Sequence, residues 1–281
     1  MSTFVQRAQT CSTATWGRNG TVSSGATRGL RTMVVVLMVG AISVGSCQAP
    51  AKGSAAIHAA LAPATPEDLV TLNLASLLPQ PPSAESAQTF EELRLLHRVE
   101  STRTAGEVAA AKADDAEEDI FIFRSVVGSE FTADRYPLTA RLGQEVHAEE
   151  AAVSKQLKTV FARPRPYQMD GTLHPVCKQT AAANSYPSGH TLSGYLLALT
   201  LAELLPEKKE AILGRADEYA QHRLICGVHY PSDLEASRRL AYVVFGYLLS
   251  NAQFSHDLQA SRNELHSYAA VAVQSSAAGE K

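Results

Sequence analysis

Residues 185–205 read SYPSGHTLSGYLLALTLAELL and predict a helix that begins at a ligand-binding turn. Ser188 is a residue type that caps helix N-termini, and the apolar run from Leu192 to Leu205 continues as a buried helix. Gly189 lets a ligand approach the backbone closely, and the exposed N–H groups of a helix start attract an anion. His190 lies beside that site. In isolation, the more ordinary interpretation is a capped helix with an incidental histidine.

A basic stretch precedes this helix at residues 158–166, which read KTVFARPRP. Lys158 falls in the last turn of a predicted helix that Pro164 must end, and Arg165 follows on an extended segment between two prolines. Lysine supplies a point charge and arginine a rigid fork, which together suit phosphate oxygens. Without a partner motif, such a stretch is usually a solvated helix C-terminus favoured by the helix dipole.

A third stretch, residues 223–233, reads RLICGVHYPSD. Arg223 lies near the end of a helix predicted to begin at Glu207, and Gly227 is the residue type that ends such a helix. A cationic side chain is thereby predicted just before a connecting loop.

The loop carries a histidine, His229, four residues before Asp233. Residues 232–235 predict a capping box, which places Asp233 in the first turn of the next helix. His229 can then donate its Nδ1–H to that carboxylate, which leaves Nε2 as a nucleophile. A surface histidine–aspartate pair is the ordinary alternative.

Three other segments carry apolar residues at helical spacing: residues 90–112, 116–127 and 140–161. In the last of them a core-facing stripe is predicted, made of Leu142, Val146, Val153, Leu157 and Val160. No segment alternates with period two, so no sheet is expected. The prediction is an all-α, single-domain helical bundle over residues 65–255, followed by a C-terminal helix or tail over 256–281.

Residues 1–49 have the pattern of an export signal. The first 32 residues hold four arginines and no acid, and the apolar run Met33–Val44 is shorter than the roughly 20 residues of a membrane span. The stretch around Cys47 looks like a lipoprotein processing box, and ordinary cleavage after Ala49 is the alternative. Residues 50–64 are predicted to form a tether. A periplasmic or secreted protein is expected, with an outer-membrane lipoprotein as the variant in which Cys47 carries a lipid anchor.

The composition excludes some classes of partner. A net charge of −3 offers no surface for nucleic acid, and no uncharged apolar run after the leader is long enough to span a membrane. Only Cys177 and Cys226 remain in the body of the chain. They can pair in an oxidising compartment, and two buried free thiols are the alternative.

Taken in order, the three stretches resemble the signature of the type 2 phosphatidic acid phosphatase superfamily. That signature is Lys, six residues and Arg-Pro, then Pro-Ser-Gly-His, then Ser-Arg, five residues, His, three residues and Asp. Ten specified positions arise by chance with a probability on the order of 10⁻⁸ at ordinary residue frequencies. The chain departs from the family at His222, where serine is usual, and at Asn184, where glycine is usual.

One branch, the bacterial class A non-specific acid phosphatases, is similar over about residues 65–250. It shares the LLPQPP run at 77–82, the SYPSGHT run and the Ile-Cys-Gly sequence ahead of His229. The resemblance implies the helical fold of acid phosphatases and vanadium haloperoxidases. It also implies hydrolysis of soluble phosphomonoesters, with phosphoryl transfer to alcohols as a further activity.

The resemblance assigns phosphate binding to Lys158, Arg165, Ser188, Gly189 and Arg223. His229 would attack phosphorus and form a phosphohistidine, Asp233 would hold its tautomer, and His190 would protonate the leaving group. No metal or other cofactor is expected, because cationic side chains fill the place of a two-metal site. No other carboxylate–histidine cluster in the sequence looks like a metal site. If Cys177 and Cys226 pair, the bond would tie the Pro-Ser-Gly-His loop to the nucleophile loop.

Alternative functions come from other classes. A vanadium-dependent haloperoxidase shares this pocket, a lipid phosphate phosphatase shares the motif, and a phosphate-binding protein without catalysis would use the same cations. The family suggests a homodimer or a larger homo-oligomer.

Overall fold

The computed structural model describes residues 73–279, and the side chains of residues 73–267. The predicted leader and tether lie outside the described residues.

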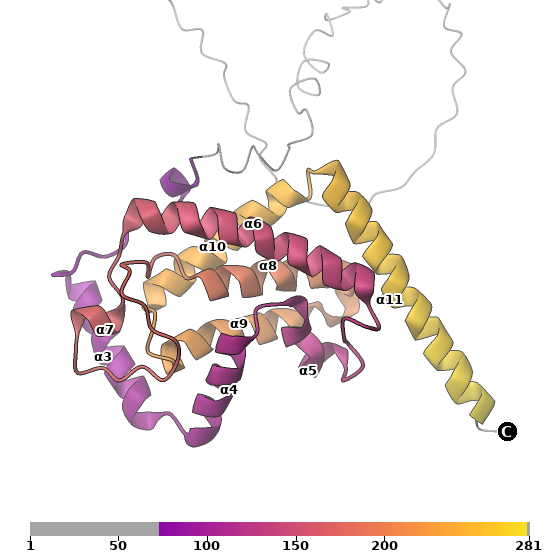
Figure 1. Cartoon of the computed structure of the whole chain (residues 1–281), viewed down its shortest axis with the longest axis horizontal. Coiled ribbons are helices and arrows are strands. Elements are labelled where there is room, and N and C mark those ends of the chain that lie inside the picture. Colours follow the sequence, from indigo (N-terminus) through magenta and orange to yellow (C-terminus); the bar gives the residue numbers. More distant parts are fainter. Residues whose placement is uncertain (1–72, 280–281) are drawn as a thin grey trace, which may run out of the picture. The chain divides into compact units, whose positions relative to one another are not determined.

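Helices make up the regular structure of residues 73–279, and no strand occurs in that range (Figure 1). In chain order the elements are η1 (Leu74–Leu77), α3 (Ala87–Thr102), α4 (Ala105–Ala116), η2 (Ile120–Phe123), α5 (Arg124–Val127), α6 (Pro137–Phe161), α7 (Pro166–Met169), α8 (Gly189–Leu204), η3 (Pro206–Lys208), α9 (Lys209–Ile225), α10 (Pro231–Leu248) and α11 (Ala252–Gly279). The prediction of an all-α fold is confirmed.

Helix α8 lies at the centre of the packing, in contact with α6, α9, α10 and α11 (Figure 1). Fourteen of its sixteen residues are buried, in keeping with an apolar run that has no polar face. A Cβ added to Gly194 would lie 2.7 Å from Cδ1 of Tyr219, so glycine at this position permits the close approach of α8 and α9. Because α8 is enclosed, its N-terminus is held against the ends of α6, α9 and α10.

Residues 90–112, predicted as one helical segment, are divided between α3 and α4. Thr104 has extended backbone angles, and its side chain forms a capping box with Glu107 that starts α4. The hydrogen bonds of this capping box replace helical ones at Thr104, so the segment is divided although its apolar spacing is continuous.

The predicted helix over residues 116–127 is also modified: α4 ends at Ala116, and the 3₁₀ helix η2 precedes α5. In α6 four residues of the predicted stripe are buried, but Val160 is 60% exposed, so its place in the stripe was wrong. Val160 lies in the last turn, beyond the part of α6 that α8 covers.

Among the described residues, no helix combines the length and the apolar composition that crossing a bilayer requires.

Candidate active site

The end of α6 delivers the first two cations. Lys158 lies in the last turn, which ends at Ala162 in the left-handed conformation at φ 44°. Arg165 is extended, with φ −75° and ψ 157°, just before Pro166 begins α7. Its Nη1 lies 3.2 Å from Nε2 of His229 and donates to the carbonyl of Val228 at 3.0 Å.

Asn184, one of the two departures from the family pattern, has a clear place in this arrangement. Its Oδ1 accepts a hydrogen bond of 2.9 Å from Nε of Arg165. The amide therefore helps to aim the guanidinium at the nucleophile loop, where the glycine usual in the family could supply no side-chain acceptor.

The N-terminus of α8 supplies the backbone part of the site. Ser188 is the N-cap, and its Oγ accepts from the backbone N–H of Thr191 at 3.4 Å. A Cβ on Gly189 would lie 2.9 Å from Nζ of Lys158, so glycine allows the ammonium to lie directly against the helix start. A cation and the free N–H groups of α8 therefore converge on one point, as an anion site requires.

The predicted nucleophile pair is also brought together. His229 is 2% exposed, and its Nδ1 lies 3.2 Å from Oδ2 of Asp233, which is fully buried. An ionised carboxylate accepts only, so Nδ1 carries the proton. Nε2 then carries the lone pair of the ring, which accepts a hydrogen bond from Nη1 of Arg165 at 3.2 Å.

The helix start that positions Asp233 differs from the predicted one. Helix α10 begins at Pro231, and the capping residue is Tyr230 rather than Ser232. Oδ2 of Asp233 accepts from the backbone N–H of Tyr230 at 2.9 Å and from the hydroxyl of Ser185 at 2.6 Å. The prediction of Ser232 as the cap was wrong because Pro231, which has no N–H, takes the first helical position.

Arg163 belongs to the basic stretch, but the sequence predicted no role for it. The structure places it behind the predicted nucleophile pair. Its Nη1 lies 2.7 Å from Oδ1 of Asp233, its Nη2 lies 3.1 Å from Oε2 of Glu92, and all three side chains are buried. The guanidinium also lies 3.8 Å from the ring centre of Tyr230. The sequence does contain a signal for this role, because Arg and Pro alternate over residues 163–166 and the prolines restrict the backbone around both arginines.

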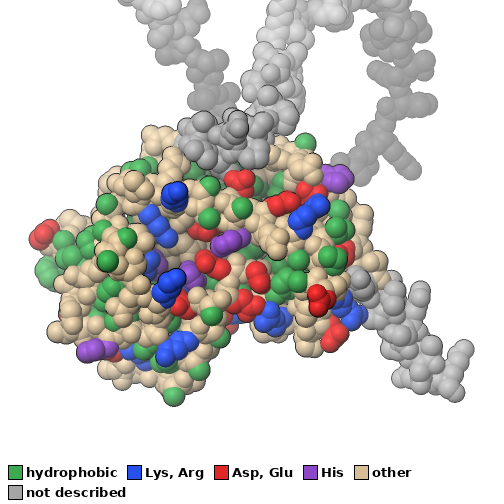
Figure 2. Space-filling view, in the orientation of Figure 1, with side chains coloured by type: hydrophobic (Ala, Val, Ile, Leu, Met, Phe, Trp, Pro, Cys, Tyr) green, Lys and Arg blue, Asp and Glu red, His purple; other side chains and the backbone are tan. Residues whose placement is uncertain are grey.

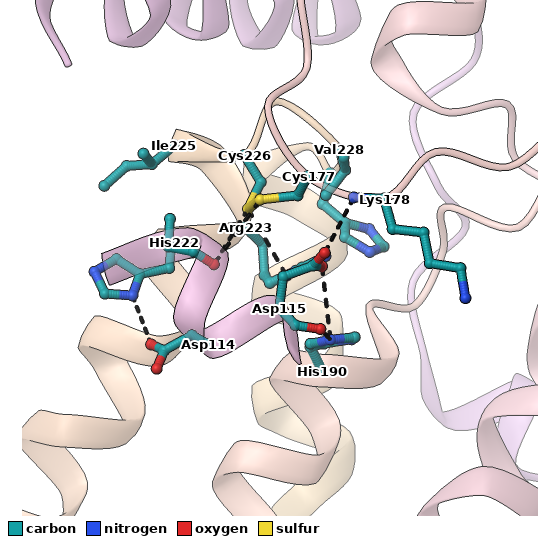
Figure 3. Close-up of a disulfide and its surroundings, with 12 residues drawn as sticks. Asp114, Asp115, Cys177, Lys178, His190, His222, Arg223, Ile225, Cys226 and Val228 are labelled. Carbon is teal, nitrogen blue, oxygen red and sulfur yellow. Dashed lines mark hydrogen bonds and ion pairs between the residues drawn. A yellow bond between two sulfur atoms is a disulfide. The ribbon is translucent and has the colours of Figure 1, made fainter. Parts of the chain in front are cut away.

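Asp115 and Glu118 are further residues that the sequence interpretation missed. Asp115 pairs with Nη1 of Arg223 at 2.8 Å, and its carbonyl lies 3.4 Å from Nε2 of His190 (Figure 3). Glu118 reaches Nδ1 of His190 at 3.3 Å. The run of acids from Asp114 to Asp119 was the only signal, because nothing local ties it to residues as distant as His190, which lies 75 positions from Asp115.

Cys177 and Cys226 form a disulfide with 5.1 Å between their α-carbons (Figure 3). The bond lies beside Arg223, whose Nη1 is 3.9 Å from Sγ of Cys226. His222 points to the other side of α9, where its Nδ1 lies 2.6 Å from Oδ2 of Asp114 (Figure 3). The unusual His222 thus anchors α4 to α9, next to the residue that pairs with Arg223.

Electrostatics at the site follow from burial among cations. Burial, followed by the charges of Arg165 and Arg223, holds the pKa of His229 well below its usual value. Burial and then Arg223 lower the pKa of His190 to about 3. Burial raises the pKa of Asp233 to about 6, although Arg163 opposes this rise. Without a bound anion, both imidazoles are therefore neutral near pH 7.

A cavity of about 660 Å³ opens onto this site, and its lining includes Lys158, Arg165, Gly189 and His190. Basic, acidic and histidine side chains gather in the middle of the face seen in Figure 2. Glu118, His147 and Glu150 line the same cavity and bring their ligand atoms within 4.8 Å of one another. The expectation that no further carboxylate–histidine cluster resembles a metal site was therefore wrong, because Glu118 comes from a part of the chain far from His147 and Glu150 on α6.

Comparisons with known proteins agree with this arrangement. The family model described as "PAP2 superfamily" matches residues 147–256. A non-specific acid phosphatase of Providencia stuartii is 34% identical over 206 residues, which cover 67% of this chain and 79% of that protein. One from Salmonella typhimurium is 35% identical over 163 residues, covering 56% of this chain and 65% of that protein. An acid phosphatase of Zymomonas mobilis is 31% identical over 191 residues, covering 66% and 70%.

Among solved structures, the first transmembrane PAP2 type phosphatidylglycerolphosphate phosphatase from Bacillus subtilis overlaps 64% of this chain and 90% of its own, at 16% identity and a TM-score of 0.44. The sequence relatives, together with the converging cations and histidines, decide the assignment. The chain belongs to the PAP2 superfamily and, within it, to the bacterial non-specific acid phosphatases that resemble class A.

Proposed function

We propose that this phosphatase is an exported, metal-independent enzyme that hydrolyses soluble phosphomonoesters through a phosphohistidine on His229. The observation that carries the proposal is the orientation of His229. Its Nδ1 faces Asp233, and its Nε2 lies next to Arg165, a residue that lines the cavity. A neutral imidazole with this tautomer can attack through Nε2 without first losing a proton.

Substrate binding would rest on three cations and the start of α8. Lys158, Arg165 and Arg223 would hold the phosphoryl oxygens together with the backbone of Ser188 and Gly189. Phosphoryl transfer needs mainly positioning and stabilisation of charge in line with the attacking atom. Three fixed cations supply that stabilisation, which is why the transfer itself would need no metal ion.

The first chemical step joins Nε2 of His229 to phosphorus while the ester P–O bond breaks. The leaving alkoxide takes a proton from His190. Water then attacks the phosphohistidine, His190 takes a proton from it, the P–N bond breaks and inorganic phosphate leaves. An alcohol in place of water would give phosphotransferase activity. Proton transfer by a positioned side chain such as His190 contributes roughly 10²- to 10⁴-fold to the rate.

An acidic pH optimum follows from the state of His190. In the empty site its pKa is about 3, because burial and Arg223 oppose its charge. A bound phosphate dianion offsets the cations, and Glu118 lies 3.3 Å from Nδ1, so substrate binding raises the proton affinity of His190. Acidic solution then favours the protonated form that the first step consumes.

The test is to trap the intermediate. Purified protein is mixed with a labelled phosphomonoester, quenched in alkali because phosphohistidine is labile to acid, and mapped by peptide mass spectrometry. The label should lie on His229 and be absent from His229→Ala. His174→Ala, which removes an exposed histidine paired with Glu100, should keep it.

Label on any other residue would refute the assignment of the nucleophile. Separately, dialysis against a chelator should leave the rate unchanged, and activity restored only by a divalent cation would refute metal independence. Fractionation of cells that express the full chain tests export, with activity expected outside the cytoplasm.

A further inference from the structure

A second cluster of side chains lies beside the phosphate-binding residues, and two of its three members, His147 and Glu150, have no role in the proposed reaction. Glu118 follows α4, and His147 and Glu150 lie one turn apart on α6. Each offers a ligand atom, and the three atoms lie within 4.8 Å of one another. The cluster lines the 660 Å³ cavity, so a solute can reach it without unfolding of the chain.

The imidazole of His147 is already oriented. Its Nδ1 lies 3.3 Å from the hydroxyl of Ser193 on the central helix α8. A histidine that engages a neighbour through one ring nitrogen presents the other as a ligand, which is the usual arrangement of histidines bound to metal ions. Ser193 is fully buried, so the orientation is fixed by the core.

Glu150 gives a second and independent indication. It is 3% exposed, and its Oε1 finds no hydrogen-bond donor among the described residues. An unsatisfied buried carboxylate oxygen is costly, and a nearby second carboxylate increases the cost. A bound cation would satisfy Oε1 and relieve the repulsion.

We propose that Glu118, His147 and Glu150 form a binding site for a divalent transition-metal cation next to the phosphate site. Two carboxylates and one imidazole are the donor set of zinc- and manganese-type ions rather than of calcium, which prefers oxygen alone. Lys158 faces the same cavity and opposes a second positive charge. The cation is therefore expected to bind more tightly when phosphate occupies the neighbouring site, because the two opposite charges then attract each other.

None of the three residues is among the cations that would hold the phosphoryl group, and Glu118 is the one member of the cluster that also contacts His190. The chelator test above asks whether the reaction needs a metal, whereas the present proposal concerns binding alone. Either can fail while the other stands.

Isothermal calorimetry with Zn²⁺ on the metal-free full chain tests the proposal. The wild-type chain should bind one ion that His147→Gln loses and that Ser193→Ala binds roughly 10- to 100-fold more weakly, as expected when the residue orienting a ligand is removed. His174→Gln is the matched control, because it removes an exposed histidine that also contacts a glutamate, and it should retain the ion. Ser193→Ala removes one hydroxyl from the core, so it keeps the test informative if His147→Gln does not fold.

An isotherm without binding in the wild-type chain would overturn the proposal. So would binding that is unchanged in both His147→Gln and Ser193→Ala, since the ion would then lie elsewhere.

Discussion

Arg163 holds the nucleophile pair from behind, and its removal should be costly in two distinguishable ways. The guanidinium pairs with Asp233 at 2.7 Å and with Glu92 at 3.1 Å, and the three side chains are buried. Arg163→Met leaves two buried carboxylates without this cation. Breaking a buried pair by removing one partner costs about 3–5 kcal/mol, so urea unfolding should show a loss of that size.

The second effect is on the pH profile. The pKa of Asp233 is about 6 even though Arg163 lowers it, so the variant should raise this pKa further. A protonated Asp233 no longer supports the Nδ1–H of His229. A carboxyl whose folded pKa is raised loses its charge at higher pH, so the ratio of variant to wild-type kcat should be lowest near about pH 5 and recover towards about pH 8.

The control is Arg94→Met, which breaks an exposed pair with Glu91 in which the two side chains are 66% and 64% exposed. Exposed pairs contribute about 0–1 kcal/mol, and neither stability nor the pH profile should change beyond that. The reasoning would be refuted if Arg163→Met resembled this control in stability, or if its kcat ratio were the same at every pH.

Two other predictions concern the acid and the disulfide. His190→Ala should lose far more kcat on alkyl phosphates than on p-nitrophenyl phosphate, whose leaving group needs no proton; equal losses would instead indicate a binding role. Replacing Cys177 and Cys226 by alanine opens a loop with a sequence separation of 49. Urea unfolding should then show a loss of about 4 kcal/mol in the chain-entropy model, and a loss below about 1 kcal/mol would contradict that account.

Local signals explain how much of the site was predictable. Ser188 is an N-cap in any context, Gly227 ends a helix because it adopts φ 73° readily, and Lys158 lies in a last turn. Such features depend on a few neighbouring residues. The order of the three motifs therefore predicted the helical fold and several residues of the cavity lining, namely Lys158, Arg165, Gly189 and His190.

Local alternatives also account for the errors in detail. Thr104 and Glu107 form a capping box that interrupts a continuous apolar pattern, and Pro231 moves the cap of α10 from the expected Ser232 to Tyr230. Val160 follows the period of the stripe but is 60% exposed in the last turn of α6. Periodicity indicates which face of a helix can be buried, while the length of the neighbouring element decides where burial stops.

The sequence by itself determined the helical architecture and the set of cationic and histidine residues that form the predicted site, because helix-forming patterns and motif spacing are local properties. The tertiary structure alone decided the partners around them. Arg163 meets Glu92 across 71 positions, and Glu118 meets His147 and Glu150 only because α6 and the end of α4 pack at the start of α8. Contacts of this kind depend on how buried helices pack together, and no pattern within one segment encodes them.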